Sequence, residues 1–283
     1  MEVGAEHNGL AEKETVAGAG RLSCRDRWLA VGVALLCLAI YLGNGKYGFP
    51  SGDAVASSEV PFALLYHGNF YVGKYGVVGN AAAPYYVVAY LGHYINRYPV
   101  GVSLTSLPLY FVYWLFGGPD TITAAAALGK ISGALMTALS VMIVFATVRR
   151  LCRGLFSAAL VTLLYGLGSE VMSISSQGMW QQSAFVLWAS LFLFAIVVPA
   201  SSVRRGQQSG AGFVAGLSLG MMFLVRPIDL VLFLPICVAY LLLSSRRRMI
   251  LTAFLVAIPF VIGGVAYNEI FSGHLFDTGY GGV

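Results

Sequence analysis

The chain has 283 residues, of which 58% are hydrophobic and only 10% carry a charge, and its formal net charge is +5. These proportions exclude an ordinary soluble domain, because a soluble core could not bury so much apolar surface. They predict an all-α polytopic membrane protein. The basic balance follows from the loops that orient such a protein, so no nucleic-acid partner is implied.

Residues 1–27 combine Glu, Gly and Ala with a few basic residues. We expect a disordered cytoplasmic tail here, followed by a transmembrane domain over residues 28–283. Acidic residues precede the first apolar run, and no convincing small-residue cleavage site follows it. The segment is therefore not expected to be a cleavable signal peptide.

Apolar runs set the expected number of membrane crossings, since a spanning helix needs about 20 apolar residues. About seven such runs occur, some of them short, at residues 28–43, 122–148, 155–168, 183–200, 211–225, 230–243 and 250–267. A further apolar stretch, residues 102–116, contains Pro108 and follows Tyr98-Pro99.

The basic residues decide how residues 102–116 are treated, because basic loops stay in the cytoplasm. With a cytoplasmic N-terminus, seven crossings place every basic cluster inside, whereas an eighth crossing at 102–116 would expose three of the four clusters. We therefore predict an interfacial or re-entrant helix at 102–116, within a first outer loop over residues 45–120. The clusters are Lys13, Arg21, Arg25 and Arg27; Arg149, Arg150 and Arg153; Arg204 and Arg205; and Arg246, Arg247 and Arg248.

The outer loop contains the carboxylate best placed for chemistry. Ser51-Gly52-Asp53 has the character of a turn that opens a weakly amphipathic helix. Asp53 would then lie near a helix N-terminus, where the dipole and free amides favour its anionic form. A role as a helix cap alone is the competing interpretation. Further along, a run of tyrosines spaced by about four residues predicts one face of an interfacial helix: Tyr85, Tyr86, Tyr90, Tyr94 and Tyr98.

Few cations lie outside the basic clusters. Lys130 and Arg226 are flanked by apolar residues, where a charge is costly unless it is paired or reaches the interface. Binding of a phosphate is one interpretation for both. The alternatives are an ion pair between Arg226 and Asp229 and outward snorkelling of Lys130. Arg97 is a third phosphate-binding candidate or, alternatively, an interface anchor.

Several polar or aromatic residues of the outer face are candidate contacts to a sugar. Trp180 could stack on a sugar ring and Gln181 could bond its hydroxyls, although Trp180 also suits an interfacial aromatic belt. His67 and Glu59 are further acceptor-binding candidates. Structural hydrogen bonding is the alternative for His67, and Glu59 would matter less than Asp53 if it faces solvent.

The remaining residues argue against other kinds of site. The four cysteines offer no metal-binding spacing and no pair on the oxidising face. The outer acidic residues are scattered, so we expect no cofactor and do not favour a divalent metal. Nucleotide-binding and hydrolase motifs of the GxxxxGK[ST] and GxSxG kinds are missing from the sequence.

Short motifs, taken in their order along residues 28–283, resemble the GT-C class of membrane glycosyltransferases, in particular its bacterial dolichyl-phosphate-mannose and lipopolysaccharide-sugar-transferase-like group. The motifs are Gly52-Asp53, His67-Gly68-Asn69-Phe70, Arg97-Tyr98-Pro99-Val100-Gly101, Gly129-Lys130, Ser176-Gln177-Gly178-Met179-Trp180-Gln181, Val225-Arg226-Pro227 and Asn268-Glu269-Ile270-Phe271-Ser272-Gly273. Members of this class usually have more helices, so the resemblance implies that the chain is incomplete at its C-terminus or is a reduced member.

The resemblance implies a glycosyltransferase of the plasma (inner) membrane that uses a polyprenyl-phosphate-linked sugar. The acceptor would be a glycan, lipid or protein at the outer face, and membrane lipids would be further partners. Asp53 would act as general base, and Lys130, Arg226 and Arg97 would bind the donor phosphate. The alternative is a non-enzymatic membrane protein, such as a lipid-linked-sugar flippase or a small-solute transporter. A transporter would show broken helices and polar residues at the membrane midplane.

Overall fold

The computed structural model describes residues 22–74, 84–152, 154–197, 205–242, 247–273 and 275. Most of the expected N-terminal tail therefore lies outside the described residues. Helix α2 (Cys24–Gly43) begins four residues before the first apolar run, because Ser23 caps it. The Ser23 side chain accepts a hydrogen bond from the backbone N–H of Asp26, and the Asp26 carboxylate accepts one from the backbone N–H of Ser23. This reciprocal arrangement is a capping box.

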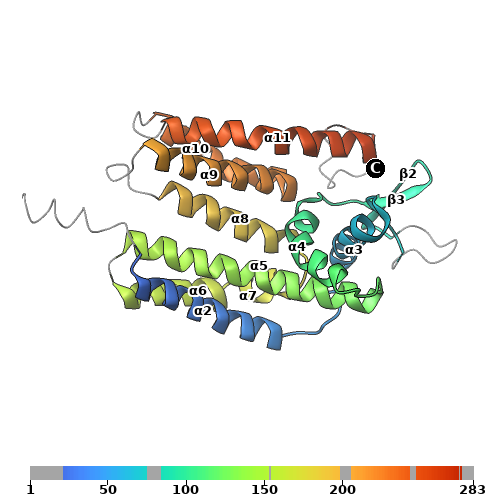
Figure 1. Ribbon diagram of the computed structural model, residues 1–283, viewed down its shortest axis with the longest axis horizontal. Helices are drawn as coiled ribbons and strands as arrows, with labels where there is room; N and C mark the ends of the chain where they lie inside the picture. Colours follow the sequence, from blue (N-terminus) through green and yellow to red (C-terminus); the bar gives the residue numbers. More distant parts are fainter. Residues whose placement is uncertain are drawn as a thin grey trace, which may run out of the picture.

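The described parts of all seven apolar runs fold as helices that lie side by side in a bundle (Figure 1). Helix α5 packs against α2, α6 and α8, and α9 packs between α8 and α11. Two short helices follow α6, and a 3-10 helix continues into α10. The bounds are α5 (Ile122–Leu151), α6 (Leu155–Leu167), α7 (Glu170–Ser173), η1 (Ser175–Gln177), α8 (Gln181–Ile196), α9 (Arg205–Val225), η3 (Pro227–Phe233), α10 (Leu234–Leu242) and α11 (Arg247–Ser272).

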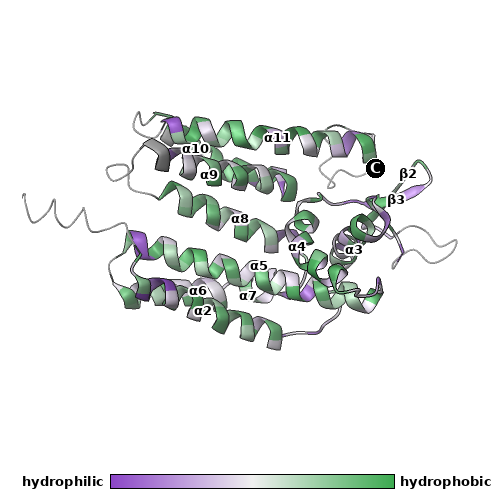
Figure 2. Ribbon diagram, in the orientation of Figure 1, coloured by the Kyte–Doolittle hydropathy of each residue, from purple (hydrophilic) through white to green (hydrophobic). Residues whose placement is uncertain are grey.

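Four helices of the described chain are long and apolar enough to cross a membrane: α2, α5, residues Gln208–Val225 of α9, and Arg247–Phe271 of α11. A fifth crossing is possible if α6 and the bent segment Glu170–Gln177 act together. Apolar residues cover the length of these helices, and hydrophilic residues gather near their ends (Figure 2). The protein is thus helical and suited to a membrane, with four to five spans supported by helix length.

Most of the described arginines lie at one end of the bundle, which we call the basic end (Figure 1). Helices α2 and α11 begin there and α5 ends there, so their termini bring together Arg25, Arg27, Arg149, Arg150, Arg247 and Arg248. Arg149 Nε lies 2.9 Å from a carboxylate oxygen of Asp26, which joins the end of α5 to the start of α2.

The opposite end, which we call the loop end, is covered by the segment between α2 and α5 (Figure 1). It contains α3 (Gly52–His67) and α4 (Gly101–Leu115), which pack on each other. The 15 residues of α4 give a helix of roughly 22 Å, shorter than the hydrocarbon core of about 30 Å. Helix α4 corresponds in position to the helix predicted at residues 102–116, and it is too short to count among the candidate membrane spans.

A small antiparallel sheet, which the sequence did not predict, lies in the same segment. Its strands β1 (Tyr71–Val72), β2 (Val87–Tyr90) and β3 (His93–Asn96) have the order β1-β3-β2. The prediction of a helix through the tyrosine run is therefore wrong. Tyr90 pairs with His93, and the turn between them has positive φ at both residues, 49° at Leu91 and 80° at Gly92. Two positive φ values are what a two-residue hairpin of type I′ requires.

Glycines let η1 approach α5 closely at the loop end. A side-chain carbon on Gly133 would overlap the carbonyl of Gly178, and one on Gly129 would lie 2.6 Å from the Ser58 hydroxyl. Neither position has room for a larger residue. The close approach holds α3, α5 and the segment after η1 in fixed relation, and this relation positions the groups described next.

Candidate functional site

Asp53 lies in the first turn of α3, as predicted, and is partly exposed. The preceding Gly52 is covered by two tyrosines: a side-chain carbon there would overlap the Tyr86 ring and lie 2.8 Å from the Tyr85 hydroxyl. Ser51 occupies the N-cap position without a side-chain capping bond. Because Gly52 has no side chain, the rings of Tyr85 and Tyr86 can pack against the N-terminus of α3, next to Asp53.

The Tyr85 hydroxyl lies close enough to the Asp53 carboxylate for a hydrogen bond to that group to contribute to a raised pKa of the tyrosine. Partial loss of hydration of the largely exposed Tyr85 and the neighbouring negative charge both raise the pKa of this phenol, the loss of hydration more strongly. Tyr85 therefore keeps its proton throughout the neutral range and remains a donor to Asp53.

Arg97 contacts the backbone of the same tyrosine pair. Its Nη1 donates to the carbonyl oxygen of Tyr85 at 3.2 Å, and its backbone N–H donates to that of Tyr86 at 3.0 Å. The end of β3 is thereby tied to the residues that cover Gly52. A guanidinium and a carboxylate thus flank one tyrosine at the loop end.

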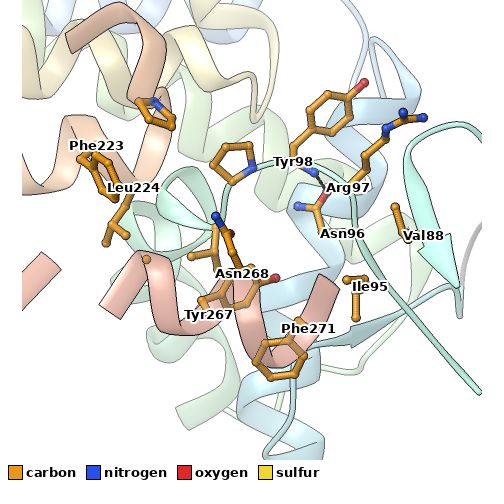
Figure 3. A pocket seen from close by; sticks show the side chains of 14 residues that line it. Val88, Ile95, Asn96, Arg97, Tyr98, Phe223, Leu224, Tyr267, Asn268 and Phe271 are labelled. Carbon is orange, nitrogen blue, oxygen red and sulfur yellow. Dashed lines mark hydrogen bonds between the residues drawn. The ribbon is translucent and has the colours of Figure 1, made fainter. Parts of the chain in front are cut away.

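Arg97 also borders a narrow groove, with a cavity volume of about 50 Å³, between the loop end and the bundle. The groove is formed by the β2–β3 hairpin, the segment that leads into α4, the end of α9 and the last turns of α11 (Figure 3). Polar and aromatic groups line it together, among them Asn96, Arg97, Tyr98, Tyr267, Asn268 and Phe271. Ligand sites commonly combine polar and aromatic groups in this way.

Lys130 does not snorkel outward, because its side chain is only 1% exposed. Its Nζ donates to Gln177 Oε1 at 2.9 Å and to the Ser176 carbonyl oxygen at 3.2 Å. No carboxylate lies within ion-pair distance of it in the described part of the chain. Lys130 therefore fastens η1 to α5, and a phosphate could reach it only if Gln177 moved.

Arg226 forms the ion pair that was considered as an alternative to phosphate binding. Its Nε lies 3.0 Å from an Asp229 carboxylate oxygen, and both side chains are about three-quarters buried, with 25% and 23% exposure. The Pro227 that follows begins η3. The charge of Arg226 is thus balanced within the protein.

Glu59 and His67 belong to a second polar cluster at the loop end, beside a cavity of about 180 Å³. Glu59 does not face solvent: it is 4% exposed and accepts hydrogen bonds from the backbone N–H groups of Gly73 and Lys74. Asp120 lies 2.6 Å from the Lys74 ammonium and 3.3 Å from His67 Nε2. These contacts fasten the segment after β1 to α3 and to the start of α5.

The segment that joins η1 to α8 is more buried than a sugar-binding loop would be. Trp180 is partly buried at the residue before α8, and Gln181 is 8% exposed. Met179 is buried and accepts a contact of 3.4 Å from the Tyr110 hydroxyl. Stacking of a sugar on Trp180 stays a prediction, whereas Gln181 offers little surface to a ligand.

Sequence reasoning missed Tyr85, Asn96 and Tyr267 as site residues. The available signal for Asn96 was its place two residues before Tyr98, where an Asn side chain commonly accepts a backbone hydrogen bond. The structure has this bond, from the Tyr98 N–H to Asn96 Oδ1 at 3.0 Å. Tyr267 is distant in sequence, and only the packing of α11 against the loop end brings it to the groove.

Within the described ranges, no group of three or more His, Cys, Asp or Glu residues could hold a metal ion. All four cysteines are free, Cys24 and Cys152 being exposed and Cys37 and Cys237 buried. Comparisons with protein-family models, with curated proteins and with solved structures find no match to this chain. The functional argument therefore rests on the residues themselves.

Proposed function

We propose that the protein is a membrane glycosyltransferase, which moves a sugar from a polyprenyl-phosphate carrier to an acceptor at the loop end. One observation carries the proposal: Asp53 and Arg97 flank Tyr85 at the covered end of an apolar helix bundle. This arrangement supplies a base and a cation next to a groove, within reach of a substrate that is anchored in the membrane.

In the proposed reaction, Asp53 accepts the proton of an acceptor hydroxyl. At the same time the oxygen of that hydroxyl bonds to the anomeric carbon of the sugar. A hydroxyl is a poor nucleophile at neutral pH, and a positioned carboxylate assists it at the moment of attack. The bond from the anomeric carbon to the carrier phosphate breaks, and its electron pair leaves with the phosphate. The partly exposed Asp53 is better suited to this role than the enclosed Glu59.

The leaving phosphate gains negative charge and needs a cation or N–H donors nearby. Arg97 is the best placed of the three candidates, since it borders the groove. Lys130 is enclosed by Gln177 and Ser176, and Arg226 is paired with Asp229. Their roles as donor ligands remain secondary parts of the proposal.

The proposed topology has seven crossings, with the basic end in the cytoplasm and the loop end outside the plasma membrane. The support is the gathering of described arginines at the basic end, since basic segments are retained in the cytoplasm. An outward loop end would give Asp53 access to acceptors outside the cell.

A transporter remains the second candidate, and one observation favours it. Helix α6 and the segment Glu170–Gln177 are bent by 41°, and the buried Lys130 bonds to that segment. Broken helices near a buried charge are a feature of transporters.

The two functions differ in their products. The deciding experiment supplies the full-length protein in proteoliposomes with a lipid-linked radiolabelled sugar and acceptors. Label covalently joined to the acceptor supports the transferase. Label that only changes leaflet, still attached to its lipid, supports the transporter.

A further inference from the structure

Lys130 is a buried cation to which the proposed reaction gives no direct contact. It is only 1% exposed, in a helix that is long and apolar enough to span a membrane. A charge in such a place is costly, and by default it indicates a function. Both acceptors of its ammonium group, the Ser176 carbonyl oxygen and Gln177 Oε1, belong to η1. The position of η1 is therefore what the lysine controls directly.

The Gln177 side chain is held by η1 and its surroundings as well as by Lys130. Its Nε2 donates to the Met172 carbonyl oxygen and to the Ser176 hydroxyl, both at 2.8 Å. Because the amide nitrogen is used in this way, its Oε1 is turned toward the lysine, 2.9 Å from Nζ. Lys130 and Gln177 thus form one connected unit, which joins α5 to the segment Glu170–Gln177.

The loop from α2 to α3 begins directly on this unit. A side-chain carbon on Gly45 would overlap Gln177 Oε1 and lie 3.7 Å from Lys130 Nζ. Gly45 also has a φ of 86°, a conformation that glycine adopts without strain. A larger residue would not fit at this position, so the backbone of the loop lies in contact with the pair that joins α5 to η1.

The same loop ends on Gly178, the residue that follows η1. A side-chain carbon on Gly178 would lie 2.8 Å from Pro50 Cγ and 3.9 Å from Ala54 Cβ. On its other side, the Gly178 carbonyl lies so close to α5 that a side-chain carbon on Gly133 would overlap it. Gly178 is thus held between α5 and the first turn of α3. Pro50 and Ala54 flank Asp53 in the sequence, so the place of this carboxylate depends on the place of Gly178.

These contacts separate two roles for Lys130. As a phosphate ligand, it would have to give up its bond to Gln177, and the cover that Gly45 provides would have to open. As a support for the α3 N-terminus, it uses the contacts that the structure already contains. Loss of such a support lowers the rate of the chemical step, whereas loss of a ligand contact weakens the affinity for the donor.

We propose that Lys130 is a positioning residue for Asp53, which holds η1 and Gly178 as the support on which the first turn of α3 rests. The proposal rests on the proposed function, in which Asp53 is the base, and deepens it. Lys130 touches no reacting atom and acts through η1 and Gly178 alone.

The first test is the steady-state kinetics of Lys130→Met in the full-length protein in nanodiscs, with a lipid-linked radiolabelled sugar as the varied substrate. Methionine is also long and unbranched, but it lacks the three N–H donors of lysine. Because a misplacement of about 1 Å can cost ~10²-fold in rate, kcat should fall by ~10², and the donor KM should stay within about twofold.

Gly178→Ala tests the other end of the same support and leaves Lys130 in place. The added methyl group would meet the Pro50 ring at 2.8 Å, which is closer than carbon atoms pack, so the start of α3 must shift. Here kcat should fall by a smaller factor than in Lys130→Met, with the donor KM again unchanged. If Lys130→Met did not fold, this variant would still decide the proposal.

A second readout does not depend on activity. In an Asp53→Cys background, the rate of alkylation by N-ethylmaleimide reports how exposed the first turn of α3 is. Peptide mass spectrometry separates the introduced thiol from the native cysteines. Addition of Lys130→Met or Gly178→Ala should raise this rate several-fold, because the turn loses its support.

Arg150→Met is the matched control, because it removes another cation from the same helix. Arg150 Nη1 donates to the Phe194 carbonyl oxygen at 3.2 Å, and the guanidinium lies 3.7 Å from the centre of the Phe194 ring. This contact is at the basic end of α5, roughly 30 Å along the helix from Lys130. Arg150→Met should lose thermal stability but keep kcat per folded molecule and the alkylation rate at residue 53.

An unchanged kcat and alkylation rate in Lys130→Met and Gly178→Ala would overturn the proposal. A donor KM that rises in Lys130→Met while kcat is kept would also overturn it, in favour of a phosphate ligand. Equal losses in Arg150→Met would reduce the effect to stability alone and reject the positioning role. Alkylation that depends on Lys130, in a protein without transfer activity, would leave the support standing and reject the transferase. Transfer that depends on Asp53 but not on Lys130 would do the reverse.

Discussion

The two ends of the bundle use their carboxylates differently. At the basic end, Asp26 is 8% exposed, completes the capping box with Ser23 and pairs with Arg149 at 2.9 Å. At the loop end, Asp53 is partly exposed, next to a tyrosine that donates to it. The same kind of group is thus enclosed by structural partners in one place and accessible in the other.

The loop end itself contains both kinds of carboxylate. Glu59 accepts hydrogen bonds from two backbone N–H groups, and Asp120 pairs with the side chains of Lys74 and His67. Both carboxylates therefore fasten the segment after β1. The comparison teaches that position on the outer face does not make a carboxylate a candidate for chemistry. Accessibility to a substrate distinguishes Asp53 from these two carboxylates.

The largest expected effect is in the labelling of cysteines, which should be all or none and should show which end of the bundle faces outward. Cys24 and Cys152 are exposed at the termini of α2 and α5 that form the basic end. In intact cells, an impermeant thiol reagent should leave the wild type unlabelled and should label a Pro119→Cys variant. Opening the membrane should then expose Cys24, Cys152 and an added cysteine at Gln207. Labelling of the wild type in intact cells would reverse the orientation, and protection of Pro119→Cys would mean that α4 crosses.

Asp53→Asn should abolish most of the transfer activity. Asparagine keeps the shape but cannot accept a proton, so turnover should fall by ~10²–10⁴, with insertion and donor binding unchanged. The assay is transfer from a radiolabelled lipid-linked sugar in a complete, full-length form of the protein. Asp26→Asn is the matched control, and its turnover per folded molecule should equal that of the wild type. Undiminished turnover in Asp53→Asn would leave Asp53 as a helix cap only.

Arg97→Gln should weaken use of the lipid-phosphate donor while the protein still inserts. Loss of a charge-assisted bond to phosphate costs about 2–3 kcal/mol, or ~30–150-fold in apparent affinity. Arg226→Gln and Lys130→Gln should change donor affinity less, since both side chains already have partners within the protein. A donor titration with all three variants ranks them, and an Arg97→Gln value equal to the wild type would remove Arg97 from the site.

Asp26→Asn should lower stability without changing the chemistry. It loses the charge in its bond to Arg149, and about 1.5 kcal/mol of unfolding free energy should be lost, the lower range for bonds to charged groups. Thermal unfolding in detergent measures the change. A lower turnover per folded molecule in Asp26→Asn would contradict the prediction, because Asp26 would then matter for the chemistry as well as for stability.

Tyr85→Phe should have the smallest effect, about fivefold in turnover, as for one neutral hydrogen bond worth about 1 kcal/mol. The pKa of Tyr85 lies above that of a free tyrosine, so its neutral form is stabilised below the ordinary pKa of about 10. The contribution to Asp53 should persist as pH rises through that value and be lost only above it. A pH–rate profile of the wild type that fell with an apparent pKa below 10, and was flattened in Tyr85→Phe, would contradict this assignment.

The sequence alone was sufficient to predict the helices of the bundle. The described part of each apolar run is helical, because long apolar segments in a membrane must satisfy their backbone hydrogen bonds internally. The start of α3 at Gly52, and with it the place of Asp53, also followed from local signals. The number of crossings did not follow from helix length, which supports four to five.

Tertiary structure decided the rest of the loop end. The tyrosine spacing of four fits a strand as well as a helix, because it is also a multiple of two, and the turn at Leu91 and Gly92 decides for the hairpin. Whether a charged side chain is paired, enclosed or accessible depends on segments far away in the sequence. Glycines at 129 and 133 admit the segment that encloses Lys130, and the packing of α11 carries Tyr267 to the groove beside Asn96. Local sequence sets where helices form, but contacts between distant segments set which polar groups are left for a substrate.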